Sequence, residues 1–184
     1  MRTFGPSLPE LVTALGATPV SLAFAETYVA LERGVADCAI TGSGSGNAAK
    51  WYEVTTHQYT LPVGWAVAGY FTNLTWWNKL PADVRAFLEA TYQEISDRQW
   101  QFGGVELTKD GIDCNAGRPG CKFGTPDKTS PMTEVTATDA DRVLLAKLVA
   151  DVIIPSWVKR CGARCGDLYN SVVAPITGVR YTPK

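Results

Sequence analysis

The stretch RTFGPSLPELVTALGATPVSLAFAETYVALERGVADCAIT, residues 2–41, decides the fold class. Its β-branched and apolar runs at 2–4, 18–22 and 35–41 are typical of short strands, and the segments between them have the apolar spacing of helices. Strands that alternate with helices in this way form right-handed βαβ units. The sequence therefore predicts an α/β protein with a mainly parallel sheet flanked by helices.

The two helices expected in this stretch carry signals at their ends. Ser7 and Glu10 have the spacing of a capping box, in which Ser7 begins the helix, and Gly16 is expected to end it. Phe24 starts the apolar face of the second helix, which Gly34 should terminate. These signals place two short helices between three strands.

The next part of the chain contains a glycine-rich segment and an aromatic segment. Residues 42–46, GSGSG, precede an expected helix at 47–54 and form either an anion-binding cradle or a flexible turn. Residues 65–73 form an aromatic and apolar run that we interpret as a strand. An unpaired strand could join two copies of the chain, so a dimerising interaction module is one alternative function.

The second half of the sequence predicts two further amphipathic helices. Pro81 begins the first of them, and residues 110–131, which are rich in Gly, Pro and Lys, should form a loop. Thr138 and Asp141 have a cap pattern ahead of the second of them, which should end before Pro155. The apolar stripe of the first helix comprises Val84, Phe87, Leu88, Thr91, Ile95 and Phe102.

Composition and charge exclude several classes of protein. The 184 residues are 46% apolar, enough for one sizeable core or two small ones. The formal net charge is −1 and the charges are interspersed, so no nucleic acid partner is expected. No apolar run is long enough for a spanning helix, so we expect a soluble chain. The single histidine, His57, has no nucleophile or acid signature nearby, and we expect no enzyme.

Four of the five cysteines form two local pairs, Cys114 with Cys121 and Cys161 with Cys165. These pairs fit two short disulfides or one four-thiolate zinc site, and the wide spacings favour disulfides. Cys161 and Cys165 could instead be free thiols one helical turn apart, and a thiol redox protein is a second alternative function. Cys38 is expected to be a small buried apolar side chain. Disulfides would indicate an oxidising compartment.

Three motifs follow one another along the chain. They are ATPVSLAFAETYVALERGVAD at 17–37, KWYEV at 50–54 and WNKLP at 77–81. In this order and spacing they resemble the G-A-x-P-x-x-x-x-F-x-E-x-Y-x-A-L-x-x-G-x-x-D, K-[FWY]-Y-E-V and W-x-x-L-P motifs of the DctP-like solute-binding proteins of TRAP transporters. The resemblance is specific from Arg2 to about Phe102 and only general beyond it.

The resemblance implies a periplasmic-binding-protein architecture, with two α/β lobes and the ligand between them. It assigns residues 1–64 to the first part of the second lobe, and residues 109–184 to its remainder with the C-terminal helices. Residues 65–108 would form a crossing strand and a long helix that reach the first lobe. A signal peptide and a first lobe would precede Arg2 in such a protein, and neither is in this sequence. The implied location is the periplasm.

The resemblance also implies a set of ligand contacts. Arg2 matches an arginine that grips the ligand carboxylate through two parallel hydrogen bonds, which a planar guanidinium provides and lysine does not. Phe24 matches a phenylalanine that lines the cleft, and Thr41 matches a polar contact at the end of a strand. Ser43 and Trp65 are expected in the wall of the cleft. A compact carboxylate with an apolar or aromatic portion is the expected ligand.

The implied function is capture and delivery without bond-making. A small organic acid would bind between the lobes and pass to the membrane permease subunits of a TRAP transporter, with no metal or organic cofactor. Closure around a ligand needs both lobes. This chain alone is therefore expected to bind weakly or not at all.

Overall fold

The structure, a computed structural model, describes residues 1–65, 69–103 and 106–183. Its strands are β1 (Arg2–Thr3), β2 (Val20–Ser21), β3 (His57–Tyr59) and β4 (Thr133–Val135). Its α-helices are α1 (Ser7–Ala14), α2 (Thr27–Glu32), α3 (Ser43–Ala48), α4 (Leu74–Trp77), α5 (Ala82–Gly103), α6 (Glu106–Asn115), α7 (Asp139–Leu148), α8 (Ile154–Cys161), α9 (Ala163–Leu168) and α10 (Ala174–Thr177). Two 3₁₀ turns cover Phe24–Glu26 and Trp51–Glu53, and two π-helical segments cover Val149–Ile153 and Tyr169–Val173.

Two small parallel sheets confirm the α/β class. β1 pairs with β2, with Arg2 opposite Val20, and β3 pairs with β4. The third strand expected at 35–41 is wrong in its extent, because that segment forms a single parallel bridge, between Ala39 and Arg2. β1 is only two residues long, so few of its backbone groups can form hydrogen bonds with neighbouring strands. It therefore lies between two short partners and not within a broad sheet.

α1 docks against α8 through the residues that the sequence assigns to a capping box. Pro6 and not Ser7 precedes the helix, and no side chain caps it, so the capping-box prediction is wrong. Glu10 instead accepts a hydrogen bond from Ser156 at 2.5 Å and pairs with Arg160. Ser7 also accepts a hydrogen bond from Arg160. The contact with α8 has replaced the local cap.

α3 and α6 approach each other so closely that only glycine fits between them. A Cβ atom on Gly111 would lie 2.5 Å from the carbonyl carbon of Ser43 and 2.6 Å from Cα of Gly44. The glycine-rich residues 42–46 therefore begin a helix, and the prediction of a flexible turn is wrong. The helix expected at 47–54 is corrected to the end of α3 and the following 3₁₀ turn.

α6 occupies the first part of the segment 110–131, which the sequence assigns entirely to a loop. Asp110, in the middle of α6, is buried, and its carboxylate accepts hydrogen bonds from the loop that follows. The donors are the N–H groups of Lys122, Phe123 and Gly124, at 2.5, 3.2 and 3.0 Å. The loop prediction is therefore wrong for residues 110–115, which are helical. The loop that follows α6 covers them.

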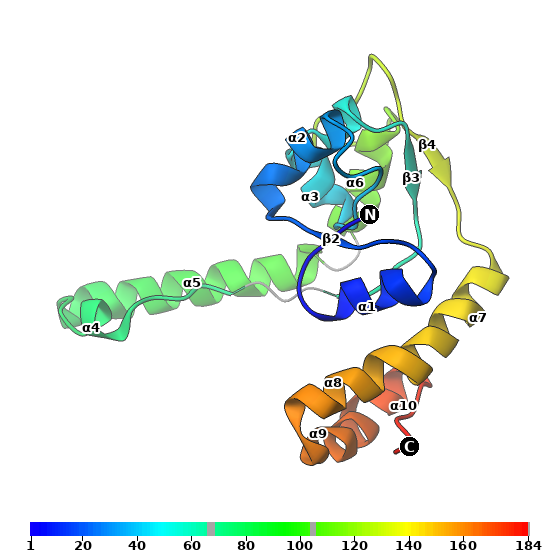
Figure 1. Cartoon of the computed structure of the whole chain (residues 1–184). Helices are drawn as coiled ribbons and strands as arrows, with labels where there is room; N and C mark the ends of the chain where they lie inside the picture. The colour runs from blue at the N-terminus through cyan, green and yellow to red at the C-terminus, as the bar shows by residue number, and fades with distance from the viewer. Residues whose placement is uncertain (66–68, 104–105, 184) are drawn as a thin grey trace.

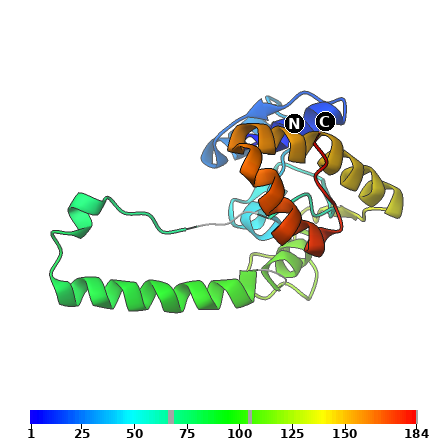
Figure 2. The same ribbon diagram turned by 90° about the horizontal axis from the view of Figure 1, so that it is seen from below.

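α5 extends from the rest of the molecule as an arm (Figures 1 and 2). The long helix predicted after Pro81 is confirmed. The strand expected at 65–73 is wrong for Trp65 and 69–73, which are not in a strand, and residues 66–68 lie outside the described residues. The dimerising module therefore loses the strand on which it depended. We call α5 together with residues 69–81, which include α4, the arm. The large apolar side chains exposed along it are Tyr70, Phe71, Leu74, Trp76, Val84, Phe87, Tyr92 and Trp100.

The last helices continue through two prolines. The side chains of Thr138 and Asp141 bond to each other's backbone at the start of α7, which confirms the predicted cap. The helix does not end before Pro155, because a π-helical segment leads directly into α8. Proline has no N–H to donate and collides with the carbonyl four residues earlier, and a wider turn relieves this collision. Pro175 follows the second π-helical segment in the same way.

In the described ranges, no helix is long and apolar enough to cross a membrane.

Candidate ligand-binding site

Arg2 has a backbone that is paired on both sides. Its N–H donates to the carbonyl of Cys38 at 2.7 Å, and its own carbonyl accepts from the N–H of Ile40 at 3.1 Å. On the opposite side it pairs with Val20 of β2. The residue is 2% exposed. Its side chain therefore projects from a fixed backbone, although it lies next to the amino terminus.

The guanidinium group of Arg2 is held by backbone carbonyls. Nε donates to the carbonyl of Leu22 at 3.1 Å, and Nη1 donates to that of Ile40 at 3.0 Å. Within the described residues, no carboxylate forms an ion pair with it. Burial lowers the pKa of Arg2, because desolvation disfavours the charged form, but arginine stays charged at neutral pH. The site thus holds a cation whose known partners are neutral.

Three aromatic rings surround this guanidinium. Its Cζ atom lies 5.1 Å from the ring centroid of Phe4, 5.7 Å from that of Trp51 and 6.0 Å from that of Phe24. These distances are in the range of cation–π attraction. The rings of Phe24 and Trp51 also contact each other, with centroids 5.3 Å apart. We call Phe4, Phe24 and Trp51 the aromatic cage.

The structure brings together two of the predicted site residues, Arg2 and Phe24. Phe24 is 43% exposed, so part of its ring remains accessible to a ligand. Phe4 and Trp51 were not among the predicted site residues, although signals for both existed. Phe4 is two residues from Arg2 and therefore on the same face of an extended chain. Trp51 is the aromatic position of KWYEV, one of the three motifs that carry the resemblance.

The other three predicted site residues differ in their surroundings. Thr41 is half-buried and directly follows Ile40, whose carbonyl holds the guanidinium group. Ser43 donates its hydroxyl hydrogen to the carbonyl of Thr108 at 2.7 Å, in a contact between α3 and α6. Trp65 is 79% exposed, and no hydrogen bond or ring contact joins it to the rest of the described chain. Of these three residues, only Thr41 is next in sequence to a residue that contacts the guanidinium group.

The cysteine pairs form two disulfides, Cys114–Cys121 and Cys161–Cys165. The disulfide interpretation is confirmed, and the shared zinc site is excluded because the sulfurs are bonded to each other. Cys38 is free and exposed, so the expectation that it is buried is wrong. The segment around it has a single strand bridge and does not enclose its side chain.

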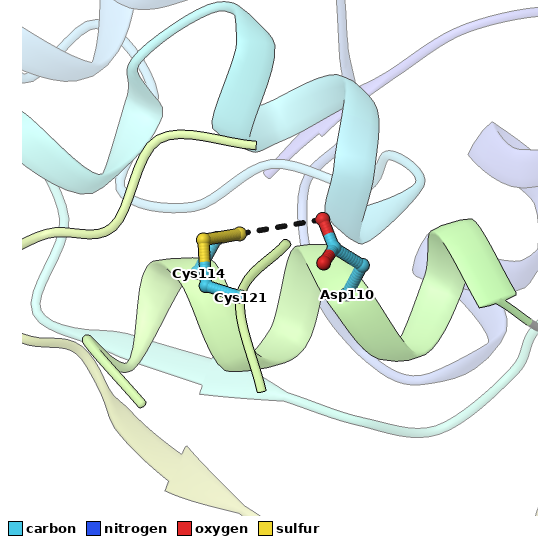
Figure 3. Close-up of side chains that lie close together, drawn as sticks. All are labelled: Asp110, Cys114 and Cys121. Atoms are coloured by element: carbon cyan, nitrogen blue, oxygen red, sulfur yellow. Dashed lines mark hydrogen bonds between the residues drawn. A yellow bond between two sulfur atoms is a disulfide. The ribbon is translucent and has the colours of Figure 1, made fainter. Parts of the chain in front are cut away.

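Asp110 lies beside the first disulfide (Figure 3). One oxygen of its carboxylate is 3.4 Å from the sulfur of Cys114, and the ligand-type atoms of Asp110, Cys114 and Cys121 all lie within 4.8 Å of one another. A bonded sulfur has no hydrogen to donate and is not a thiolate ligand. The carboxylate already accepts three backbone N–H groups. The cluster therefore fixes the loop after α6 and does not resemble a metal centre.

Comparison with known proteins identifies the family. Residues 1–142 match the model of the bacterial extracellular solute-binding protein family 7, DctP. The chain belongs to this family. A curated relative, the C4-dicarboxylate-binding periplasmic protein DctP of Rhodobacter capsulatus, is 36% identical over 86 residues, which make up 47% of this chain and 26% of the relative.

A solved structure shows the same fold. The crystal structure of a TRAP periplasmic solute binding protein from Desulfovibrio salexigens with bound orotic acid matches 91% of this chain and 50% of its own chain. The TM-score is 0.67 and the sequence identity is 22%. The family 7 chain described here therefore has the fold of such a binding protein over half of the length of that structure.

Proposed function

We propose that this chain is part of the extracytoplasmic solute-binding component of a TRAP-type transporter, which captures a small organic carboxylate and delivers it to a membrane permease. The observation that carries the proposal is the buried guanidinium group of Arg2, which has two backbone carbonyl partners and no ion pair within the described residues. A guanidinium has five N–H donors, so donors remain for a ligand. A bound carboxylate would accept them and neutralise the buried charge.

The proposed ligand class is a compact carboxylate with an apolar or aromatic portion. Arg2 would bind the carboxylate, the accessible part of the Phe24 ring would contact the apolar portion, and Thr41 would contact a further polar atom. Ser43 and Trp65 would line the wall of the closed cleft. The two relatives support an acid ligand, because one is named for binding C4-dicarboxylates and the other holds orotic acid, a carboxylate on a planar ring.

Binding in the complete protein would require a second lobe. We assign residues 1–64 and 109–184 to one lobe, and residues 65–108 to a segment that reaches the other. The exposed apolar side chains of the arm support this assignment, because surfaces of this kind usually have a partner. The chain also spans only half of the matched structure. With one wall of the cleft missing, this chain alone would bind its ligand weakly.

The proposed location is the periplasm, and the proposed activity is binding without bond-making. Two disulfides support an oxidising compartment. The family is described as extracellular and solute-binding. No step of capture and delivery needs a metal or an organic cofactor.

A comparison of acids with their neutral amides tests this function. Succinate and orotate would be titrated into the 184-residue ¹⁵N-labelled chain, and succinamide and orotamide would serve as matched controls. We expect both acids, or one of them, to shift the Nε–H resonance of Arg2 saturably, because only a carboxylate matches the charge and the donors. An amide that shifts the resonance as much as its acid does would contradict the proposal.

A further inference from the structure

Trp51 is almost completely buried but keeps an unpaired polar group. It is 6% exposed, and its indole N–H has no acceptor among the described residues. A buried donor without a partner costs free energy, and phenylalanine would avoid that cost while keeping an aromatic ring. The indole ring therefore offers something that phenylalanine offers less well. Tryptophan presents the most favourable face of all aromatic side chains to a cation.

The position of Trp51 matches that role. It packs in the core with Leu31 and Ala36, and its ring centroid also lies 5.7 Å from Cζ of Arg2. Lys50, directly before it, has a left-handed backbone that costs free energy for a residue with a side chain. Such a conformation persists where the surrounding structure requires it, and here it sets the direction in which the chain enters the turn that carries Trp51.

Aromatic rings have an advantage over a carboxylate as partners of Arg2. A protein carboxylate would neutralise the guanidinium but would also occupy the paired N–H groups that a ligand carboxylate needs. An aromatic face stabilises a cation without accepting those N–H groups. The aromatic cage can therefore compensate for the desolvation of Arg2 and leave its remaining donors free.

We infer that Trp51 is a positioning residue for Arg2, and that its ring, with the rest of the aromatic cage, takes the place of a protein counter-ion and holds the guanidinium ready for a ligand anion. This inference rests on the proposed function, because it assigns to Arg2 the binding of a ligand carboxylate. The role of Trp51 is to act through Arg2 and not to touch the ligand, since its indole nitrogen is buried.

The test compares Trp51→Phe with Trp51→Leu in the full chain without ligand. The readout is the ¹⁵N Nε–H resonance of Arg2, identified by its loss in Arg2→Lys. In the unmodified chain we expect a resonance that is displaced by ring currents and exchanges slowly with water. Trp51→Phe should keep most of the displacement and of the slow exchange, because phenylalanine attracts a cation less strongly than tryptophan but still does so. Trp51→Leu should lose the part of the displacement that residue 51 contributes and should exchange about tenfold faster, while Phe4 and Phe24 remain. Trp157→Leu is the matched control, because Trp157 packs near Tyr169 in the C-terminal helices and should leave the resonance unchanged.

Thermal unfolding of the same variants separates positioning from packing. A residue with only a structural role would lower stability in Trp51→Leu and leave the Arg2 resonance unchanged, and that result would overturn the inference. If Trp51→Leu does not fold, an undisplaced and rapidly exchanging resonance in the unmodified chain overturns it equally. A displaced and protected resonance that depends on residue 51 but shifts equally with the acids and with their amides supports the inference and counts against the proposed function alone.

Discussion

The absence of a side chain at residue 111 lets α6 contact α3. A Cβ there would lie 2.5 Å from the carbonyl carbon of Ser43, which is backbone and cannot turn aside. Gly111→Ala should therefore push the helices apart and lower the free energy of unfolding by at least about 2 kcal/mol, as measured by urea denaturation. Gly103→Ala, at the end of α5, is the matched control, because no atom of the described part of the chain lies within 4 Å of its added atom. Equal stability of the two variants would contradict the close packing.

Asp113 is a nearly buried carboxylate between two cations. Lys109 donates to it at 2.6 Å, and Arg118 donates at 3.5 Å. These partners, Lys109 first, lower the pKa of Asp113 below its usual value. A carboxylate with a lowered folded-state pKa stabilises the protein above its unfolded pKa, and this contribution is lost as the pH falls through the folded value.

The substitution Asp113→Asn should remove this pH-dependent contribution. The variant should therefore unfold at a lower temperature than the unmodified chain at about pH 7, and the difference should shrink towards about pH 2. Thermal unfolding across this range provides the measurement. A difference of the same size at every pH would show that the charge of Asp113 contributes nothing.

At the scale of elements, signals within one segment predicted the structure well. Gly16 and Gly34, with φ of 79° and 68°, follow α1 and α2 as expected, because a positive φ ends a helix locally. The errors come from contacts between distant segments. Ser7 contacts Arg160 of α8 and does not cap α1, and residues 43–46 and 110–115 are helical because α3 and α6 pack closely against each other. No pattern within a single segment of the sequence indicates such contacts between distant segments.

The candidate site also contains residues that the sequence predicted and residues that it did not. Arg2 and Phe24 were predicted from the family motifs, and the structure places them together. Phe4 and Trp51 were not predicted, because the aromatic cage assembles from three separate segments. The long helix was predicted as amphipathic, but a stripe of apolar residues does not say whether its partner lies in the same chain.

The loop after α6 depends on the charge of Asp110. Its carboxylate accepts three backbone N–H groups, and a neutral amide presents only one oxygen. Asp110→Asn should therefore lower the free energy of unfolding by about 2 kcal/mol and speed amide hydrogen exchange at residues 122–124. Asp97→Asn, an exposed carboxylate on α5, should leave those amides unchanged. Slow exchange at 122–124 in Asp110→Asn would refute the role of the carboxylate.

At the scale of the whole molecule, a packed body carries an arm with little packing of its own (Figure 1). Phe87 and Trp100 are 69% and 80% exposed, so replacing each with serine should change stability by less than about 0.5 kcal/mol and reduce binding of a hydrophobic dye. Phe102→Ser, on the same helix, should destabilise the chain more, because Phe102 contacts Phe123 with ring centroids 4.7 Å apart. If the serine variants at 87 and 100 unfold, these side chains are already buried against another surface, and the arm is not exposed.

The arm and the site have complementary roles in the proposed function. The guanidinium group of Arg2 is fixed in the body, and the apolar side chains of the arm are exposed; we propose that these side chains meet a partner that completes the cleft. We propose that the guanidinium group of Arg2 receives the carboxylate of the ligand, and a substitution of Arg2 tests this contact.

The most direct measurement is the affinity for succinate or orotate of the unmodified chain, Arg2→Lys and Arg33→Lys, determined from the backbone amide resonances in NMR titrations. Lysine keeps the charge but not the paired donors, so Arg2→Lys should bind the acid at least about tenfold more weakly. Arg33→Lys, the same change at an exposed position, should bind like the unmodified chain. A folded Arg2→Lys variant with unchanged affinity would contradict the account.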